Sequence, residues 1–475
     1  MIRNHERANT SLQSTLQSFA LHGLASALSI ALVATWAGCG GSISTSQAAG
    51  GQPDAGTGNG GDEGGAPASG SSSGGSGGGD GAATPANNGA PSNTFPAFPI
   101  DVAQVVDNGG PVLAAPTVVT ITWSSDTDAE TYNAFGDAIG ASAYWKDINS
   151  EYGVGPATSG AANHVSITTA APTTYSDAQL DALVESSAGT SWPAYTTNTI
   201  YAVYLPPGTS ITLQGQDACS QGIGGYHTES QNKNYVYAIM PHCNGFQVSD
   251  IELDASHELN EASTDPHPST NTAYMGFDQN HLAFEFFNQF QDELGDACEA
   301  FVTSSDAVDF TPYTVQRQWS NKSAAAGSQW CLPKLPEPFY NTTFLPQTNL
   351  DTINVNLNAL YPGAGSATSK GFKMALNTSR TFPIGLFSDE DTNGPFSLDV
   401  YGMTDPIAQD QNGNNINNGT ATVTFDLSSG ENGQISNVTV TPTAYSSLGI
   451  VFFAIRAQLP NSQQHHYLPV LISEN

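Results

Sequence analysis

Basic residues are scarce in this chain. Only 11 lysines and arginines stand against 43 aspartates and glutamates among 475 residues, which gives a formal net charge of -32 at pH 7. Because a chain with this much negative charge is repelled by phosphate backbones, we do not expect nucleic acid as a partner. Charged residues of either sign make up only 11% of the chain, whereas glycine, serine, threonine and asparagine are abundant. This composition is more typical of an exported, β-rich protein than of a cytosolic helical one.

Two common catalytic patterns are also missing. The sequence contains no glycine-rich phosphate-binding loop. Ser256 stands beside His257, but a serine on a continuous helix lacks the sharp turn that exposes a nucleophilic hydroxyl. We therefore expect no nucleotide-phosphate site of this type in the chain, and no serine nucleophile at Ser256.

The first 39 residues are typical of a targeting segment. Arg3 and Arg7 precede a mostly apolar run over residues 19–37, which ends in Trp36-Ala37-Gly38-Cys39. Small residues directly before a cysteine resemble the lipobox of bacterial lipoproteins, although Trp36 departs from the usual aliphatic residue. The resemblance implies lipidation of Cys39 and, because Gly40 is not aspartate, an outer-membrane or cell-surface location. A plain secretory signal or a transmembrane anchor is the alternative, and all three export the rest of the chain.

Residues 40–94 consist mainly of glycine, serine, alanine and asparagine, with almost no large apolar side chain. Such a segment cannot bury enough surface to offset the entropy of ordering, so we expect a disordered, flexible tether. The predicted organisation is therefore a lipoprotein signal peptide (1–39), a linker (40–94), a central domain (95–335) and a C-terminal domain (336–475).

Four cysteines remain after Cys39: Cys219, Cys243, Cys298 and Cys331. An even number in an exported chain indicates two disulfides. Pairing by proximity in the sequence gives Cys219–Cys243 and Cys298–Cys331, although four cysteines allow three arrangements. A zinc site made of all four thiolates is the alternative, but the chain has no closely spaced C-x-x-C pair to favour it.

Strand and helix patterns alternate in the central domain. Apolar, β-branched segments at residues 118–123, 199–205 and 235–240 predict buried strands. A helical pattern covers residues 132–148, and a capping pattern at Ser176 begins another helix that reaches about Ser187. This alternation predicts an α/β or α+β domain.

The segment SDIELDASHELNEASTDP, residues 249–266, contains the candidate chemistry. Ser249 and Glu252 have capping-box spacing and Pro266 ends the pattern, which predicts a helix over about 250–263. His257 and Glu261 are four residues apart, so their side chains lie on neighbouring turns and can bind one cation. Glu258 lies beside them. The alternative is an acidic helix face that simply meets water, because His-Glu-x-x-His is the stronger zinc motif.

Short motifs follow one another in order through residues 100–335. They are ITW at 121–123, Tyr144-Trp145, Asn198-Thr199-Ile200-Tyr201, Gly225-Tyr226-His227, YAIM before Cys243, Thr264-Asp265-Pro266, Glu293-Leu294-Gly295-Asp296-Ala297-Cys298, and VQRQWSN at 315–321 before Cys331. This order resembles the bacterial branch of the phosphate-induced protein family, the EXORDIUM-like proteins. The resemblance covers about half of the chain and implies a zincin-like domain with a His-Glu-x-x-Glu metal helix.

Two features qualify what the resemblance implies. Plant members lack the His-Glu pair, so the scaffold also exists without a metal helix, and the fold by itself does not imply catalysis. The chain also carries extra residues at 275–291, with the aromatic run Phe284-Glu285-Phe286-Phe287. This insertion either reshapes a substrate cleft or adds a helix.

A catalytic zinc ion takes three protein ligands and leaves one position for water. His257 and Glu261 supply two, and Asp296 is the preferred third because a disulfide at Cys298 would hold it in place. Glu293 and His227 are the alternatives. Glu258 is then the general base that takes a proton from water activated by the metal. Calcium in a structural role is an alternative to zinc.

The C-terminal domain is predicted to be an all-β sandwich. Apolar residues alternate at 396–400, 423–427 and 438–440, and more continuous runs lie at 450–455 and 468–472, with glycine, asparagine and proline between them. The sequence as a whole therefore predicts an α+β protein, an exported, surface-anchored metallopeptidase-like hydrolase of protein or peptide substrates. The alternative is a non-enzymatic surface protein on a degenerate zincin scaffold.

Overall fold

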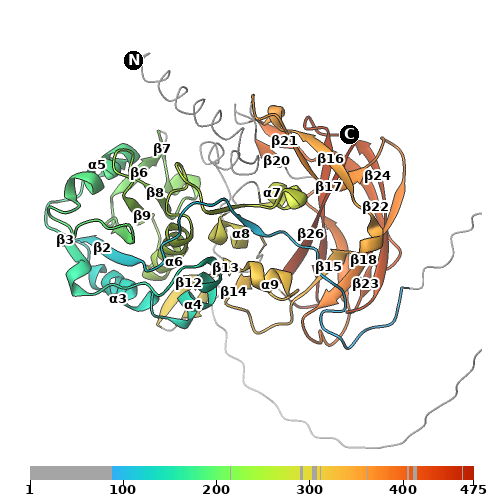
Figure 1. Ribbon diagram of the computed structural model, residues 1–475, viewed down its shortest axis with the longest axis horizontal. Helices are drawn as coiled ribbons and strands as arrows, with labels where there is room; N and C mark the ends of the chain where they lie inside the picture. The colour runs from blue at the N-terminus through green and yellow to red at the C-terminus, as the bar shows by residue number, and fades with distance from the viewer. Residues whose placement is uncertain are drawn as a thin grey trace, which may run out of the picture. The chain divides into compact units, whose positions relative to one another are not determined.

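The computed structural model describes residues 88–475 except 214, 289–292, 302–306, 311, 361, 404–405, 410–413, 463 and 475. The predicted signal peptide, the lipidation candidate Cys39 and most of the predicted linker lie outside the described residues. Within them the protein is a mixed α+β structure in which strands outnumber helices, as predicted (Figure 1).

The central region contains a five-stranded sheet. Its order is β3 (His164–Ile167), β2 (Thr117–Trp123), β5 (Thr199–Tyr204), β9 (Val236–Met240) and β8 (Tyr226–Glu229). The first four strands are parallel, and β8 pairs antiparallel with β9 at the edge. β5 and β9 are buried along their whole length, which explains why they read as continuous apolar runs. The three strands predicted in this region are confirmed to within one or two residues.

Helices cover both faces of this sheet. Helices α3 (Ala129–Ile139), α4 (Ala143–Asn149) and α6 (Val248–Thr264) share one hydrophobic core with it, and α5 (Asp177–Ser187) packs in a second core on the opposite side. The capping box of α5 at Ser176 is confirmed. The helical pattern predicted over 132–148 forms two helices, α3 and α4, rather than one. The first helix ends at Gly140, where a Cβ would lie 2.4 Å from Ala157. The second begins after Ser142, whose hydroxyl caps α4.

Helix α6 begins earlier than predicted and is capped differently. The N-cap is Gln247, and its backbone N–H donates to Asp250 Oδ2 at 2.6 Å. Ser249 and Glu252 are not the capping pair, because Glu252 accepts instead from the backbone N–H of Thr314. The alternative of an acidic face that meets water is wrong, because His257, Glu258 and Glu261 are all buried.

The C-terminal region consists of two sheets that enclose one core. The four-stranded sheet has the order β15 (Tyr340–Phe344), β18 (Arg380–Ser388), β24 (Ile435–Ala444), β22 (Thr420–Phe425). The six-stranded sheet has the order β16 (Asp351–Asn356), β17 (Ser366–Lys373), β26 (His465–Ser473), β25 (Ile450–Gln458), β19 (Phe396–Tyr401), β23 (Ser429–Gly430). Every strand predicted here overlaps one of these elements, although β22 ends at Phe425, two residues before the end of the predicted segment 423–427.

The described residues of the predicted insertion, 275–288, connect the central region to the six-stranded sheet. Strand β10 (Tyr274–Phe277) pairs with β1 (Val105–Asp107), and helix α7 (Leu282–Phe287) follows. Helix α7 lies beside β17 and β26 (Figure 1). Leu282, Ala283 and Phe286 pack in one core with side chains of β16, β17, β25 and β26. The described part of the insertion therefore adds a helix, whose apolar side chains join the two regions.

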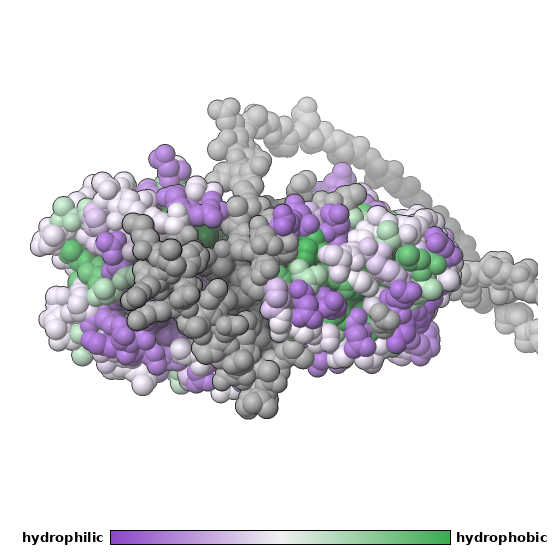
Figure 2. Space-filling model, turned by 90° about the horizontal axis from the view of Figure 1, so that it is seen from above, coloured by the Kyte–Doolittle hydropathy of each residue, from purple (hydrophilic) through white to green (hydrophobic). Residues whose placement is uncertain are grey.

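The described surface is largely polar. In Figure 2, hydrophilic and intermediate residues cover most of the coloured face, and hydrophobic residues form only small patches. Among the described residues, no helix has the length and apolar character that a membrane crossing requires.

His281 forms ion pairs with two carboxylates, Asp278 on its own segment and Asp101 from a distant part of the chain. Its Nδ1 lies 2.8 Å from Asp278 Oδ2 and its Nε2 lies 3.2 Å from Asp101 Oδ1. Burial alone would lower the pKa of His281, but the hydrogen bonds to Asp101 and Asp278 outweigh it and raise the pKa to about 9. A folded-state pKa above the unfolded one stabilises the protein below the unfolded pKa, and this stabilisation is lost as pH rises through about 9.

We therefore expect His281→Gln to lower the free energy of unfolding by up to roughly 3 kcal/mol at pH 6. The difference from the wild type should vanish above about pH 10. Guanidinium unfolding at several pH values measures it. The control is His164→Gln, because His164 pairs with one carboxylate only, that of Asp137, which is 41% exposed, and the pair should matter little. An equal loss at pH 6 and pH 10 would contradict the charged pairing of His281.

Candidate metal centre

His257 and Glu261 lie on successive turns of α6 and face each other. Nε2 of His257 is 2.8 Å from Oε2 of Glu261. The side chain of His257 is 10% exposed and that of Glu261 is 2% exposed, because α6 packs against β8, β9, β12 (Tyr313–Gln316) and α8 (Leu294–Phe301). The imidazole and the carboxylate that the sequence predicted as ligands are thus adjacent and buried.

Helix α8 brings the predicted third ligand to this pair. Asp296 Oδ1 lies 3.6 Å from His257 Nε2, and donor atoms of His257, Glu261 and Asp296 all lie within 4.8 Å of one another. The backbone N–H groups of Gly295 and Asp296 donate to Glu261 Oε1 at 2.9 and 3.3 Å. A Cβ on Gly295 would lie 2.7 Å from His257 Nδ1, so only glycine allows α8 to approach this closely.

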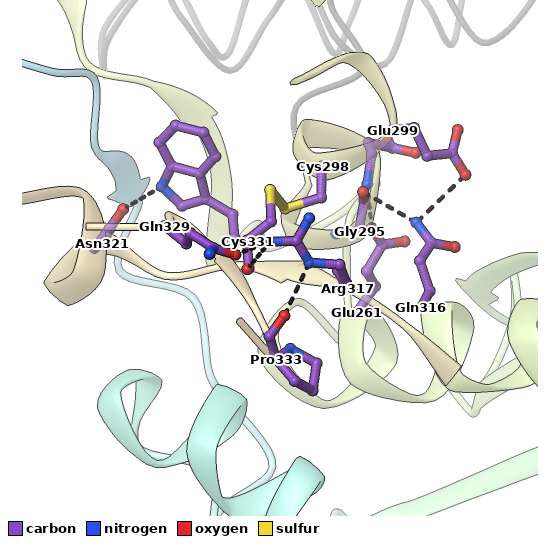
Figure 3. The surroundings of a disulfide bond; sticks show 12 residues. Glu261, Gly295, Cys298, Glu299, Gln316, Arg317, Asn321, Gln329, Cys331 and Pro333 are labelled. Atoms are coloured by element: carbon purple, nitrogen blue, oxygen red, sulfur yellow. Dashed lines mark hydrogen bonds between the residues drawn. A yellow bond between two sulfur atoms is a disulfide. The ribbon is translucent and has the colours of Figure 1, made fainter. Parts of the chain in front are cut away.

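The second nitrogen of His257 is held by Gln316. Nδ1–H of His257 donates to Gln316 Oε1 at 2.9 Å, and the amide nitrogen of Gln316 donates to the carbonyl of Gly295 at 3.1 Å. Figure 3 shows Gln316 beside Gly295 and Glu299. This contact directs the Nε2 lone pair of a neutral His257 toward Glu261 and Asp296. Sequence reasoning did not single out Gln316, because a neutral amide has no ligand spacing, and its only signal was its place in the VQRQWSN motif.

Glu258, the predicted base, is buried next to the same cluster. Its Oε2 lies 3.4 Å from Nδ1 of His227. The backbone before β8 approaches α6 closely, since a Cβ on Gly225 would lie 2.7 Å from Glu258 Oε1 and one on Gly224 would lie 2.5 Å from Asp254 Oδ2. The two glycines therefore let the main chain lie directly against these carboxylates.

His227 and Glu293, the alternative third ligands, form a second group with Glu261. Nδ1 of His227 lies 3.6 Å from Glu261 Oε2, and Nε2 lies 3.5 Å from Glu293 Oε1. Nε2 also donates to the carbonyl of Asp265 at 3.1 Å. Donor atoms of His227, Glu261 and Glu293 lie within 4.8 Å of one another, as in the first group.

Both disulfides flank the site, and the proximity pairing is confirmed. Cys298 follows Asp296 by two residues and is bonded to Cys331 on β14 (Cys331–Leu332), as Figure 3 shows. Cys219 and Cys243 are bonded on the other side, and the loop that they close contains Gly224, Gly225 and His227. The alternative of a four-thiolate zinc site is therefore wrong.

The buried carboxylates outnumber the imidazoles, and their pKa values reflect it. Burial would lower the pKa of His257, but the charges of Glu261 and Glu258 hold it well above its usual value. Burial would raise the pKa of Glu261, but His257 and His227 lower it. Burial together with the charge of Glu261 raises the pKa of Asp296 well above its usual value. A divalent cation would relieve this repulsion, so the donor set fits a metal ion.

The chain matches no family model, no curated protein and no solved structure.

Proposed function

We propose that this chain is a metal-dependent hydrolase of the peptidase type that holds zinc through His257, Glu261 and Asp296. The observation that carries the proposal is the convergence of one imidazole nitrogen and two carboxylate oxygens within 4.8 Å, from two elements far apart in the chain. One nitrogen and two oxygens suit zinc with an open fourth position. Calcium takes oxygen ligands only, so His257 favours zinc over calcium.

Each residue has a defined part in the proposed reaction. Bound zinc supplies a Lewis acid that polarises a carbonyl and lowers the pKa of water to ~7. Glu258, adjacent to His257 on α6, accepts the proton that water gives up and can return it to the leaving amine. Gln316 holds His257 in the ligating tautomer. The backbone N–H groups of α8 keep Glu261 ionised and oriented.

The proposal includes a zincin-like fold and export to the bacterial surface. Support for the fold is a buried His-Glu-x-x-Glu helix, packed on the sheet and followed by buried Thr264 and Asp265. Support for export is the pair of disulfides, which persist in oxidising compartments. The lipid anchor at Cys39 and the linker would then present the folded region outside the membrane. Protein or peptide is the proposed substrate.

A second candidate is a surface protein that uses the metal only for stability. Burial favours it, since the side chains of His257, Glu258 and Glu261 are only 10%, 7% and 2% exposed. Asp296 and Glu299 are more open, at 24% and 45%. A substrate would therefore have to approach from the side of α8.

Metal content tests the proposal directly. We expect the exported chain, purified without added metal, to carry at least one zinc ion per molecule by elemental analysis, and His257→Ala to lose it. The matched control is His164→Ala, whose imidazole lies outside the cluster and should leave the zinc content unchanged. A wild-type chain that holds no zinc, even after incubation with the metal and desalting, would overturn the proposal.

A further inference from the structure

The group formed by His227, Glu261 and Glu293 resembles the first group in its chemistry. It too combines one imidazole with two carboxylates whose donor atoms lie within 4.8 Å of one another. His227 is on β8, Glu261 is on α6, and Glu293 directly precedes α8. His227 and Glu261 are both buried. The side chain of Glu293 is only 13% exposed.

Glu261 belongs to both groups, and its two oxygens have different partners. Oε1 accepts the N–H groups at the start of α8. Oε2 faces both imidazoles, at 2.8 Å from His257 and 3.6 Å from His227. We propose that the carboxylate of Glu261 bridges two divalent cations, one held with His257 and Asp296 and the other with His227 and Glu293. This inference rests on the proposed function, because it adds a second ion beside the zinc ion.

The charge of the cluster supports two ions rather than one. The two imidazoles lie within 3.6 Å of the carboxylates of Glu258, Glu261, Glu293, Asp296 and Glu299. When both imidazoles bind metal they are neutral, so a single divalent ion leaves an excess of buried negative charge. Two ions supply four positive charges against these five carboxylates, and like charges in a buried site repel strongly.

The donor set also indicates which ions fit. Imidazole with carboxylates suits zinc, manganese or cobalt better than magnesium or calcium. Two such ions ~3.5–4 Å apart are a known way to hold both the attacking and the leaving atoms of a hydrolytic reaction. Here the residues of the second group lie next to Glu258, because His227 contacts both Glu258 and Glu261.

Metal titration of the full exported chain tests the bridge. The metal-free protein is titrated with manganese(II), and bound ions are counted by elemental analysis and by electron paramagnetic resonance. We expect two ions per chain and the multiline signal of coupled manganese. His227→Gln, which keeps a hydrogen-bond donor for the Asp265 carbonyl, should bind one ion with an uncoupled signal. The control His267→Gln changes a half-buried imidazole outside both groups and should still bind two ions.

Each other outcome counts against the second ion in a distinct way. One ion in the wild type that is unaffected by His227→Gln overturns the second site and leaves the proposed zinc site standing. One ion that is lost in both His227→Gln and His257→Ala means a single shared site and overturns the bridge. No bound ion in the wild type overturns the bridge and the proposed function together. Near-ultraviolet circular dichroism of each variant shows that the counts refer to folded protein.

Discussion

Glu258→Gln is expected to lower the rate of peptide hydrolysis by roughly 10²- to 10⁴-fold while the zinc content stays unchanged. Glutamine has the size of glutamate, so it should fit the buried space beside Gly225 and His227. It cannot accept a proton from water, so the chemical step loses its base. The ligands His257, Glu261 and Asp296 are not altered, so zinc should remain.

The measurement uses a peptide mixture derived from a proteome, because the preferred sequence is not known in advance. Mass spectrometry identifies the bonds that the wild type cleaves, and initial rates are then compared on the best synthetic peptide. Glu252→Gln is the matched control, since Glu252 is buried on the same helix but accepts from the backbone of Thr314 and belongs to neither group of candidate ligands. Wild-type rates in Glu258→Gln would contradict its role as base. No cleavage by the wild type would favour the metal-stabilised surface protein.

The core of the candidate site could be predicted from the sequence because it depends on local geometry. Residues four apart on a helix must lie on neighbouring turns, so His257 and Glu261 were identifiable as a pair. Asp296 lies 35 residues beyond Glu261, and only its position beside Cys298 pointed to it. Gln316 was not predicted. Its role depends on β12 packing against α6, and a long-range pairing of this kind leaves no spacing in the sequence.

The helix ends were predicted wrongly because equivalent local sequence signals compete and tertiary contacts decide between them. Ser249 with Glu252 and Gln247 with Asp250 both have capping-box spacing, and the tertiary contact of Glu252 with Thr314 decides between them. The predicted helix over 132–148 ignored Gly140, whose close approach to Ala157 depends on a segment that folds back from later in the chain. Strands with strict alternation or continuous burial were predicted well, because the side-chain period of a strand is set locally.

The Cys298–Cys331 disulfide is expected to have the second large effect. Replacing both cysteines by serine should lower the free energy of unfolding by roughly 3–4 kcal/mol, because the bond closes a loop of 33 residues. The same change should also weaken zinc binding, since Asp296 and the N–H groups that hold Glu261 precede Cys298 by only two or three residues. Guanidinium unfolding measures the first effect, and zinc titration of the folded variant measures the second.

A comparison with the other disulfide distinguishes the effect of loop entropy on stability from the effect of the disulfide on the position of Asp296. Cys219–Cys243 closes a loop of 24 residues, for which the chain-entropy model gives roughly the same 3–4 kcal/mol. Its removal should therefore cost similar stability, but it frees the His227 side of the cluster and leaves His257, Glu261 and Asp296 in place. We expect the first zinc ion to be retained in Cys219→Ser/Cys243→Ser and lost in Cys298→Ser/Cys331→Ser. If both double variants retain it equally, then the buried side chains of Leu294 and Ala297, which share a core with Phe277 and Trp319, hold α8 in place without the disulfide.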